Sequence, residues 1–337
     1  MLTPELRAAL QSHYQLDPSL PAHHLTGGEW KTLYRVGNAV VSISHPSATV
    51  AGVAYEHRFL NYLHPLLPQV PVPIPARDGR TFFEYQGRIV TLLPWMRGNH
   101  ANREQARLPA AILLAHYHQA ALNYPDRSPR PDVSAWWAWD WADQDWPQIR
   151  ALLASQPGSP WPAAQRFWGM GGAWTQEICT RWSQIEAERA NLQRWVAGLA
   201  ASDRQLVVAP IHDDYHRKNL LVDDEGITAL LDWDGCHPDW LLWDVATATW
   251  EFCLDKQAHT LVVPQAQAFL QAYTAANSLV SPATFDLIIP FMRARRMIEI
   301  LSDLRVIVTD QPWPDGHTEY IVHNLIALDN LRSLLLF

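Results

Sequence analysis

Residues 206–234 read LVVAPIHDDYHRKNLLVDDEGITALLDWD, and this stretch decides how the chain is expected to fold. Two short apolar runs in it flank the turn at residues 223–226, and apolar runs around a Gly-containing turn predict an antiparallel hairpin. Asn219 begins the hairpin and Asp232 ends it, so antiparallel pairing brings the two residues close together. One amide oxygen and one or two carboxylates then converge, and hard oxygen ligands of this kind suit Mg²⁺.

The residues just before the hairpin follow the spacing His-x-Asp-x-x-x-x-Asn, with His212, Asp214 and Asn219 in the defined positions. This is the spacing of a kinase catalytic loop, in which the Asp accepts the proton of the attacking hydroxyl. The Asn and a downstream Asp hold the metal ions that bridge the nucleotide phosphates. We therefore expect Asp214 and His212 to form the catalytic loop, with His212 as a brace, and Asn219 and Asp232 to bind the metal.

The first hundred residues carry strand signals that are interrupted by one helix. Two β-rich runs around the Gly37-Asn38 turn predict a hairpin, and a second strand pair is joined through Gln86-Gly87. The expected strands are 33–36, 39–44, 81–85 and 88–92, and the expected helix is 50–63. The breaker-rich segment 93–98 is the candidate domain boundary.

Beyond this segment the apolar spacing becomes helical. The expected helices are 108–122, 178–199, 261–273, 285–301 and 320–335, and only the β-rich segment 205–232 interrupts them. The sequence therefore predicts an α+β protein, with a small β-rich N-terminal lobe (residues 1–98) and a larger, mainly helical C-terminal lobe (residues 99–337).

Composition narrows the class of protein. With 26 Lys and Arg against 34 Asp and Glu, the formal net charge is −8, which argues against a nucleic-acid partner. No apolar run approaches the roughly 18 residues of a membrane span, and the N-terminus does not resemble a signal peptide. Three cysteines without a Cys-x-x-Cys motif suit a reducing compartment. We expect a cytoplasmic protein with no membrane partner, and the sequence leaves its oligomeric state open.

Several motifs together resemble the aminoglycoside phosphotransferase and choline kinase-like superfamily, which includes homoserine-kinase-like enzymes. The catalytic-loop residues 212–223 resemble its signature, residues 231–234 its metal-binding motif, and residues 114–118 its Leu-Ala-x-Leu-His helix. Asp244 falls where the family has an Asp that braces the catalytic loop. The resemblance spans roughly residues 20 to 300. It implies a bilobal protein-kinase-like fold that binds ATP or GTP, with Mg²⁺, between its lobes.

The resemblance also implies positions for nucleotide-binding residues in the first lobe. Gly27 and Gly28 would form the turn that covers the nucleotide. Glu56, on the expected helix, falls where the family keeps a glutamate. The segment 92–98 would be the hinge, with Leu93 as a contact for the nucleotide.

One position departs from the family pattern. The second strand of the family carries a Lys or Arg that meets the α- and β-phosphates, and here that position is Ser42. Serine cannot supply a positive charge. Lys31 and Arg35, one strand earlier, could replace it if their side chains point into the cleft, so Lys31 and Ser42 both count as candidate nucleotide-binding positions.

The leading hypothesis is a small-molecule kinase that transfers the γ-phosphate of ATP or GTP to a hydroxyl, with Mg²⁺ and with Asp214 as base. The alternative is a pseudokinase or nucleotide-binding module that lacks turnover because Ser42 replaces the strand lysine. A third hypothesis takes His212, Asp213, Asp214 and His216 as the metal cluster of a hydrolase, which would need further ligands at metal spacing.

The acceptor is expected to bind in the helical lobe, in the segment between the hinge helix and the catalytic loop. That segment is rich in tryptophan, with Trp at 136, 137, 139 and 141 and acids at 140, 143 and 145. The ordinary interpretation of such a cluster is a packing surface. Aromatic faces beside acidic residues would also suit a cationic amine or a sugar.

Overall fold

The computed structural model describes residues 2–26, 31–133, 140–169, 173–277, 279–309 and 317–336. The chain forms two compact units. Unit 1 contains Met1–Ser134, Val208–Asp244 and Ala272–Leu279, and unit 2 contains Ala135–Val207, Val245–Gln271 and Val280–Phe337. Unit 1 continues well beyond residue 98, and the lobe boundary expected there stays a prediction.

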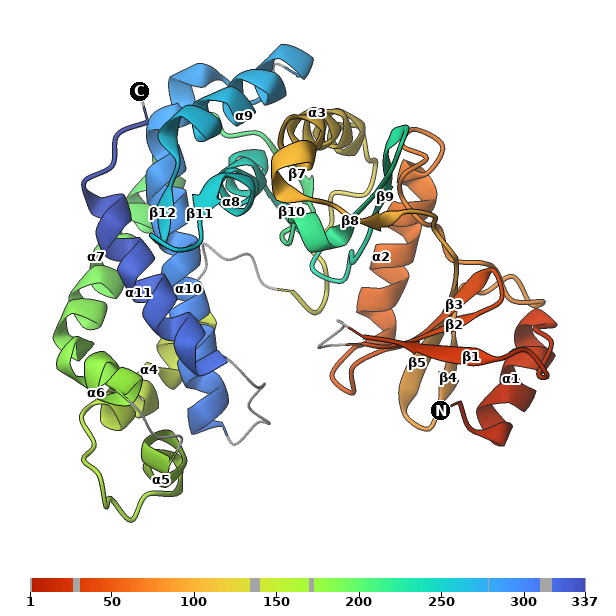
Figure 1. Ribbon diagram of the computed structural model, residues 1–337, viewed down its shortest axis with the longest axis horizontal. Helices are drawn as coiled ribbons and strands as arrows, with labels where there is room; N and C mark the ends of the chain where they lie inside the picture. Colours follow the sequence, from red (N-terminus) through yellow and green to blue (C-terminus); the bar gives the residue numbers. More distant parts are fainter. Residues whose placement is uncertain are drawn as a thin grey trace. The chain divides into compact units, whose positions relative to one another are not determined.

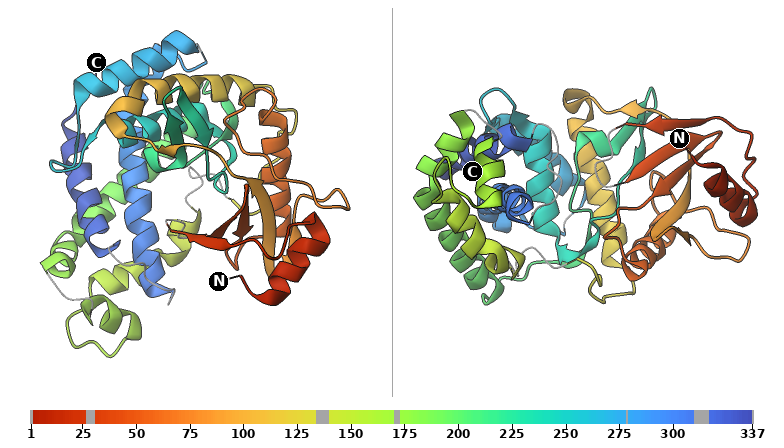
Figure 2. Two further views of the ribbon diagram at one scale, coloured as in Figure 1. Left: turned by 45° about the vertical axis from the view of Figure 1, so that its right-hand side comes forward. Right: turned by 90° about the horizontal axis from the view of Figure 1, so that it is seen from below.

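A five-stranded antiparallel sheet opens unit 1, in the order β1-β2-β3-β5-β4 (Figure 1). Its strands are β1 (Ala22–Leu25), β2 (Thr32–Val36), β3 (Ala39–Ile43), β4 (Phe83–Tyr85) and β5 (Arg88–Pro94). Both strand pairs expected from the sequence are present, since β2 pairs with β3 and β4 pairs with β5. Figure 2 shows the sheet from two further sides.

Helix α1 (Pro4–Tyr14), which the sequence analysis did not predict, covers one face of this sheet. Thr3 caps the helix by accepting a hydrogen bond from the Leu6 amide, and Leu6 and Leu10 lie in a core with Tyr34, Val41 and Leu92. Tyr34, Val41 and Leu92 are in register with one another across β2, β3 and β5. Because side chains alternate along a strand, the opposite face carries the next register row, which consists of Leu33, Ser42 and Thr91.

Helix α2 (Val50–Leu63) has the bounds expected from the sequence. Thr49 caps it by accepting a hydrogen bond from the Gly52 amide. Its buried Phe59 ring meets the indole of Trp233 edge to face, with ring centroids 5.9 Å apart. Since Trp233 stands between Asp232 and Asp234, this contact joins α2 to the segment that carries both aspartates.

The second half of unit 1 is built around the segment that decided the fold. It contains β6 (Asn99–His100), α3 (Arg103–Leu122), β7 (Val208–Ile211), the 3₁₀ turn η2 (Arg217–Asn219), β8 (Leu220–Asp223), β9 (Gly226–Leu230) and β10 (His237–Trp240). The expected hairpin is confirmed, because β8 and β9 pair antiparallel with Leu220 opposite Leu230. Strand β10, which pairs antiparallel with β7, was not predicted.

The hinge segment ends at Gly98, which has φ +115°. A Cβ atom there would lie 2.8 Å from the Val222 carbonyl oxygen and 2.7 Å from the Thr228 hydroxyl. Glycine is therefore needed both for the backbone conformation and for the close approach of this segment to the hairpin.

Helices dominate the rest of the chain, where the hydrogen-bonded pair β11 (Leu254–Asp255) and β12 (Thr260–Leu261) is also found. The helices are α4 (Asp140–Leu153), α5 (Pro162–Gly169), α6 (Ala173–Thr180), α7 (Trp182–Ala200), α8 (Leu241–Cys253), α9 (Val263–Ala276), the 3₁₀ segment η3 (Pro282–Leu287), α10 (Ile288–Val308) and α11 (His317–Arg332). The single helix expected over 178–199 is wrong, since α6 ends at Thr180 and α7 begins at Trp182. Arg181 between them has ψ +4° and does not continue the helix.

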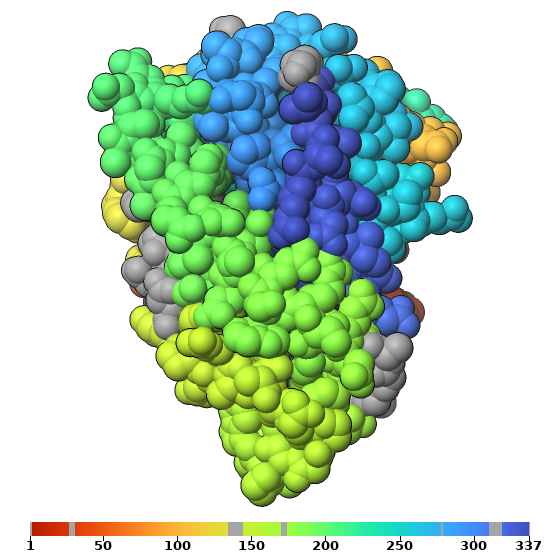
Figure 3. All heavy atoms as spheres, turned by 90° about the vertical axis from the view of Figure 1, so that its left-hand side faces the viewer, coloured from red at the N-terminus to blue at the C-terminus, as the bar shows by residue number. Residues whose placement is uncertain are grey.

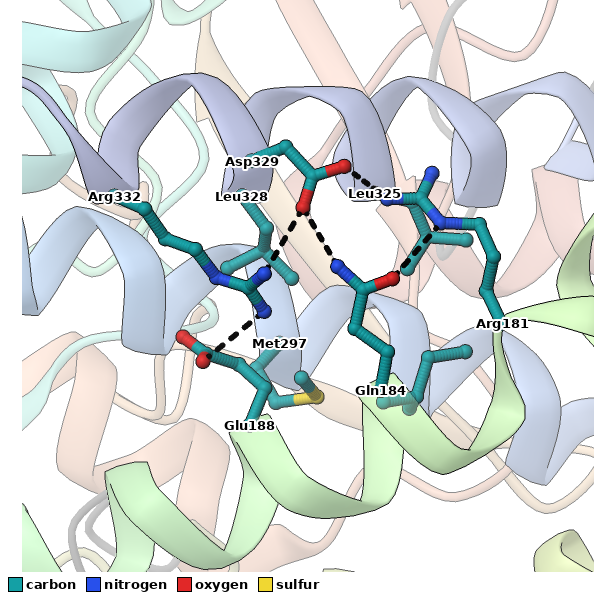
Figure 4. Close-up of a pocket in the computed structure, with 9 residues that line it drawn as sticks. Arg181, Gln184, Glu188, Met297, Leu325, Leu328, Asp329 and Arg332 are labelled. Carbon is teal, nitrogen blue, oxygen red and sulfur yellow. Dashed lines mark hydrogen bonds and ion pairs between the residues drawn. The ribbon is translucent and has the colours of Figure 1, made fainter.

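Helices α5 to α7 (green) and α10 and α11 (blue) share one face of unit 2 in Figure 3. A pocket between α7, α10 and α11 is drawn in Figure 4. Polar side chains of the lining bind one another there: Arg332 pairs with Glu188, and Asp329 pairs with Arg181 and accepts a hydrogen bond from Gln184. The polar lining groups thus tie α11 to α7 and to Arg181, which immediately precedes α7.

None of the helices within the described ranges is both long and apolar enough to cross a membrane. The expected cytoplasmic location stays a prediction.

His57 on α2 leads us to expect a loss of stability in acid. Its ring is buried, and its Nδ1 lies 2.7 Å from the Thr81 hydroxyl oxygen. Burial, with a smaller contribution from the Lys31 ammonium, lowers the pKa of His57 to about 3. Below the ordinary histidine pKa of about 6.5 the unfolded chain therefore binds a proton that the folded chain does not. Lowering the pH to about 5 should reduce the free energy of unfolding by about 2 kcal/mol through His57 alone.

The His57→Gln variant should lack this acid-dependent loss. Urea denaturation near pH 8 and near pH 5 gives the free energy of unfolding at each pH. The drop between the two pH values is then compared between the variant and the wild type. His64→Gln is the matched control, because His64 stands at the end of the same helix and also makes one hydrogen bond, to the Val70 carbonyl. Equal losses in wild type and His57→Gln would contradict the prediction.

Candidate active site

The catalytic loop is held by a buried carboxylate. Asp244 accepts hydrogen bonds from the backbone N–H of His212 (2.8 Å) and of Asp213 (3.0 Å). Asp213 has φ +66°, an unfavourable conformation for a residue other than glycine. A second hydrogen bond, from the Trp243 indole N–H to Asp213 Oδ1 (2.8 Å), helps to hold this conformation. The brace that the family resemblance assigned to Asp244 is therefore present.

Asp244 is in turn fixed by side chains from other elements. His118 Nε2 lies 3.3 Å from its Oδ2, and His118 Nδ1 lies 2.7 Å from the Tyr273 hydroxyl. Burial alone would raise the pKa of Asp244, but the donors from His118 and from the His212 backbone lower it below the usual value. Asp244 is therefore a charged acceptor at neutral pH.

His212 is fully buried, and both of its ring nitrogens are occupied. Nδ1 accepts a hydrogen bond from the Asp214 amide, and Nε2 lies 2.9 Å from the Leu231 carbonyl oxygen. Since Nδ1 accepts, the ring proton is on Nε2 and the imidazole is neutral. The ring thus links the loop to the end of β9, which is the role of a positioning residue.

Asn219 connects the loop to the hairpin. Its side-chain NH₂ group donates to Asp214 Oδ2 (3.0 Å) and to the Asp214 backbone carbonyl (2.9 Å). Its backbone carbonyl accepts a hydrogen bond from the Leu231 amide (2.8 Å). The structure thus brings Asp214 and Asn219 into contact and puts Asp232 one residue beyond the Asn219–Leu231 bond. Within the described residues no donor reaches Asn219 Oδ1, so this oxygen is available as a ligand.

His216, which the sequence offered only as a ligand in the hydrolase hypothesis, contacts Asp214. Its Nδ1 accepts a hydrogen bond from the Lys218 amide, and its Nε2 lies 3.2 Å from Asp214 Oδ2. Nε2 therefore carries the ring proton and donates a hydrogen bond to the carboxylate. The alternation His-x-Asp-x-His around Asp214 was the only sign of this contact in the sequence.

Trp233 orients the two aspartates beside it. Its indole is buried against the rings of His212 (centroids 4.6 Å apart) and Tyr117 (5.1 Å). The side chains of Asp232 and Asp234 remain 44% and 38% exposed, so both carboxylates are accessible. Asp232 also has φ +64°, so its backbone is held in a left-handed conformation.

The cation at these aspartates is Lys31, which precedes β2. Its Nζ lies 3.2 Å from Asp232 Oδ1 and 3.3 Å from Asp234 Oδ2. Burial would lower the pKa of Lys31, but the carboxylates of Glu56, Asp234 and Asp232 raise it well above its ordinary value. Burial and the neighbouring aspartates raise the pKa of Glu56, and Lys31 opposes this shift. Carboxylates outnumber the ammonium here, and such an excess of negative charge suits a divalent cation.

The other predicted nucleotide-binding positions lie on the sheet. Ser42 is buried beside Thr91, and Leu93 lies opposite Val40 two register pairs away on the same strands. The Arg35 guanidinium lies over the Trp95 ring, 4.1 Å from its centroid, and is held there by the Gly37 carbonyl. Of the two basic residues considered as replacements for the strand lysine, Lys31 is thus the one that contacts the site aspartates.

Some predicted residues lie outside the described part of the chain. These are Gly27 and Gly28, the tryptophans at 136, 137 and 139, and the side chains of residues 140, 141 and 143. Asp145 is described and forms an ion pair with Arg305 at 2.7 Å, so its carboxylate already has a cationic partner.

The residues fit magnesium better than a transition metal. Asn219 Oδ1 and the Asp232 carboxylate are hard oxygen donors, and a cation already lies at Asp232. In the described ranges no three His, Cys, Asp or Glu side chains form a metal cluster. The hydrolase hypothesis is wrong for a specific reason: His212 Nε2 is bonded to a carbonyl and Asp213 Oδ1 to an indole.

Comparison with known proteins agrees with this geometry. The family model described as the phosphotransferase enzyme family matches residues 27–282, which is more than half of the chain. The chain belongs to this family. The resemblance noted from the catalytic-loop motifs is thereby confirmed.

The curated proteins to which this chain is similar include homoserine kinases. The protein from Cupriavidus metallidurans is 28% identical over 220 residues, covering 63% of this chain and 57% of the relative. The protein from Ralstonia nicotianae is 29% identical over 217 residues, covering 62% and 55%. The matched part of this phosphotransferase-family chain therefore spans little more than half of the length of these relatives.

Solved structures confirm the expected protein-kinase-like α+β fold. Amicoumacin kinase, in complex with AMP-PNP, Ca²⁺ and its antibiotic, has a TM-score of 0.68 at 14% identity, over 96% of this chain and 92% of that one. A choline/ethanolamine kinase family protein from Mesorhizobium loti has a TM-score of 0.67 at 17% identity, over 99% and 96%. At these identities the likeness concerns the fold alone.

Proposed function

We propose that this member of the phosphotransferase family is a small-molecule kinase, which transfers the γ-phosphate of ATP to a hydroxyl group with the help of Mg²⁺. The observation that carries the proposal is the contact of the Asp214 carboxylate with the Asn219 side chain. The Asn219 backbone carbonyl accepts a hydrogen bond from the Leu231 amide, and the next residue, Asp232, forms an ion pair with Lys31. These groups are the base, the metal ligands and the phosphate-neutralising cation that phosphoryl transfer requires.

Asp214 would act as the general base. Its side chain is 46% exposed, so an acceptor hydroxyl can reach it. Donors from Asn219 and His216 on its Oδ2 hold the carboxylate in one orientation, which favours proton transfer in a fixed geometry. His212 and Asp244 would act indirectly, by fixing the backbone that carries Asp214.

Asn219 Oδ1 and Asp232 would hold the metal, with water and nucleotide oxygens completing its coordination. When bound, Mg²⁺ would supply positive charge that offsets the negative charge of the nucleotide phosphates during transfer. Lys31 would contribute a further positive charge to the phosphates. In this proposal Lys31, from its position just before β2, replaces the lysine that the family carries at the position of Ser42.

A nucleotide-binding module without turnover is the second candidate, because Ser42 leaves the strand position uncharged. The position of Lys31 favours the kinase, since it supplies the missing charge from another element.

The test is a panel of acceptors with ADP release as the readout. Because the curated relatives are homoserine kinases, homoserine and other amino alcohols come first, followed by sugars and aminoglycosides. We expect one class to release ADP at a rate that EDTA abolishes. Thermal stabilisation by Mg-ATP without turnover on any acceptor would favour the binding module. Turnover with a neutral acceptor alone would overturn the expectation of a cationic one.

A further inference from the structure

The loop that follows Asp232 and Asp234 packs directly on the catalytic loop. A Cβ atom on Gly235 would lie 3.3 Å from the His212 carbonyl oxygen and 3.6 Å from Asp213 Cβ. Any movement of this loop therefore changes the position of Asp232 and Asp234 relative to Asp214. The carbonyl groups of Gly235 and Cys236 are each held by a buried basic side chain.

Arg130 holds the Cys236 carbonyl. Its side chain is 4% exposed, and its Nη1 donates to the Cys236 oxygen at 3.1 Å. Its Nε donates to Asp132 Oδ1 (2.8 Å), and the other oxygen of Asp132 accepts from the Thr49 hydroxyl (3.1 Å). Since Thr49 caps α2, Arg130 couples the loop to the start of the helix that carries Glu56.

His237 holds the Gly235 carbonyl. Its ring is buried, with Nδ1 2.7 Å from the Gly235 oxygen and Nε2 3.3 Å from Asp239 Oδ2. A carbonyl and a carboxylate can only accept, so both ring nitrogens carry protons and the imidazole is charged. Burial would lower the pKa of His237, but Asp239 and Asp213, the charged groups that face it, raise it to about 9.

The strand pairing puts this cation directly beside the catalytic loop. His237 lies opposite Ile211 in the pairing of β10 with β7, and Ile211 precedes His212. The other oxygen of Asp239 accepts from the Trp240 amide, so the anion that balances the imidazolium is also fixed.

We propose that Arg130 and His237 are positioning residues, two buried cations that hold successive carbonyls and thereby fix Asp232 and Asp234 relative to Asp214. This inference rests on the proposed metal-dependent kinase function. Because the two cations already hold this loop in place, metal binding does not have to order it. Loss of either cation would release the loop, so it should weaken metal binding. Removing outer partners of a metal site typically costs about 10–100-fold in metal affinity or activity.

The test is Mn²⁺ binding to the full chain in the presence of AMP-PNP, followed by electron paramagnetic resonance. His237→Phe and Arg130→Gln should weaken Mn²⁺ binding by about 10–100-fold. His237→Gln, which keeps a neutral hydrogen-bond donor, should lose less Mn²⁺ affinity than His237→Phe. The affinity for AMP-PNP without metal should stay near the wild-type value in all three. His64→Gln is the matched control, because it removes a histidine–carbonyl hydrogen bond away from the site.

Unchanged Mn²⁺ affinity in His237→Phe and Arg130→Gln would overturn the inference. Equal losses of Mn²⁺ affinity and metal-free AMP-PNP affinity would overturn it too, because they indicate a general loss of structure. If His237→Phe does not fold by circular dichroism, His237→Gln decides the question for that residue. A wild-type protein that binds no Mn²⁺ with AMP-PNP would instead contradict the proposed function itself.

Discussion

Replacing Asp214 by Asn should lower turnover by about 10²–10⁴-fold, because a neutral amide cannot accept the proton of the acceptor hydroxyl. The substitution preserves the size of the side chain. An amide oxygen at this position can still accept from Asn219 and His216, so the loop should keep its structure. The affinity for Mg-ATP should therefore stay close to that of the wild type.

The measurements are ADP release with an acceptor from the panel and calorimetric titration with Mg-AMP-PNP. Asp224→Asn is the matched control, since Asp224 is an exposed aspartate in the turn of the adjacent hairpin. Its turnover should equal that of the wild type. Full activity in Asp214→Asn would show that another group accepts the proton.

Replacing Lys31 by Met should have opposite effects on nucleotide and on metal. A hydrogen bond to a charged group contributes about 1.5–3 kcal/mol, so losing the ammonium should weaken Mg-ATP binding by roughly 10–100-fold. Without nucleotide, the same variant should bind Mn²⁺ more tightly, because no ammonium remains to compete for Asp232 and Asp234. A residue with a merely structural role would not give effects of opposite sign.

Arg35→Met is the control for Lys31→Met, because it removes a positive charge from the adjoining strand. The Arg35 guanidinium lies against Trp95 and the Gly37 carbonyl, so its loss should leave both affinities nearly unchanged. Nucleotide binding that is normal in Lys31→Met and lost in Arg35→Met would assign the phosphate charge to Arg35. Normal Mg-ATP affinity in both variants would contradict the proposal that Lys31 replaces the strand lysine.

Local pattern was enough to predict the hairpin and the motif that precedes it. Strands β8 and β9 are joined by a short turn, so pairing partners lie close in sequence and the register follows from the apolar runs. The same holds for the β2–β3 and β4–β5 pairs and for the bounds of α2. The contact of Asn219 with Asp214 lies within one loop and follows from the five-residue spacing.

Contacts between distant segments carried no comparable signal. The end of the helix at Thr180, the packing of α1 on the sheet and the pair of β10 with β7 depend on partners elsewhere in the chain. Asp145 illustrates the point: its sequence neighbours suggest a ligand wall, but its carboxylate binds Arg305 on α10.

The order of residues by itself determined the chemistry that we propose for this protein, because the proposed base, the amide and the carboxylate stand at fixed spacings around a hairpin whose pairing is local. Tertiary structure alone decided which cation reaches the aspartates and what holds their loop. Lys31 lies 201 residues from Asp232, and Arg130 lies 106 residues from Cys236. Flexible basic side chains find such distant partners only when packing brings the backbones together, and no periodicity in the sequence records that approach.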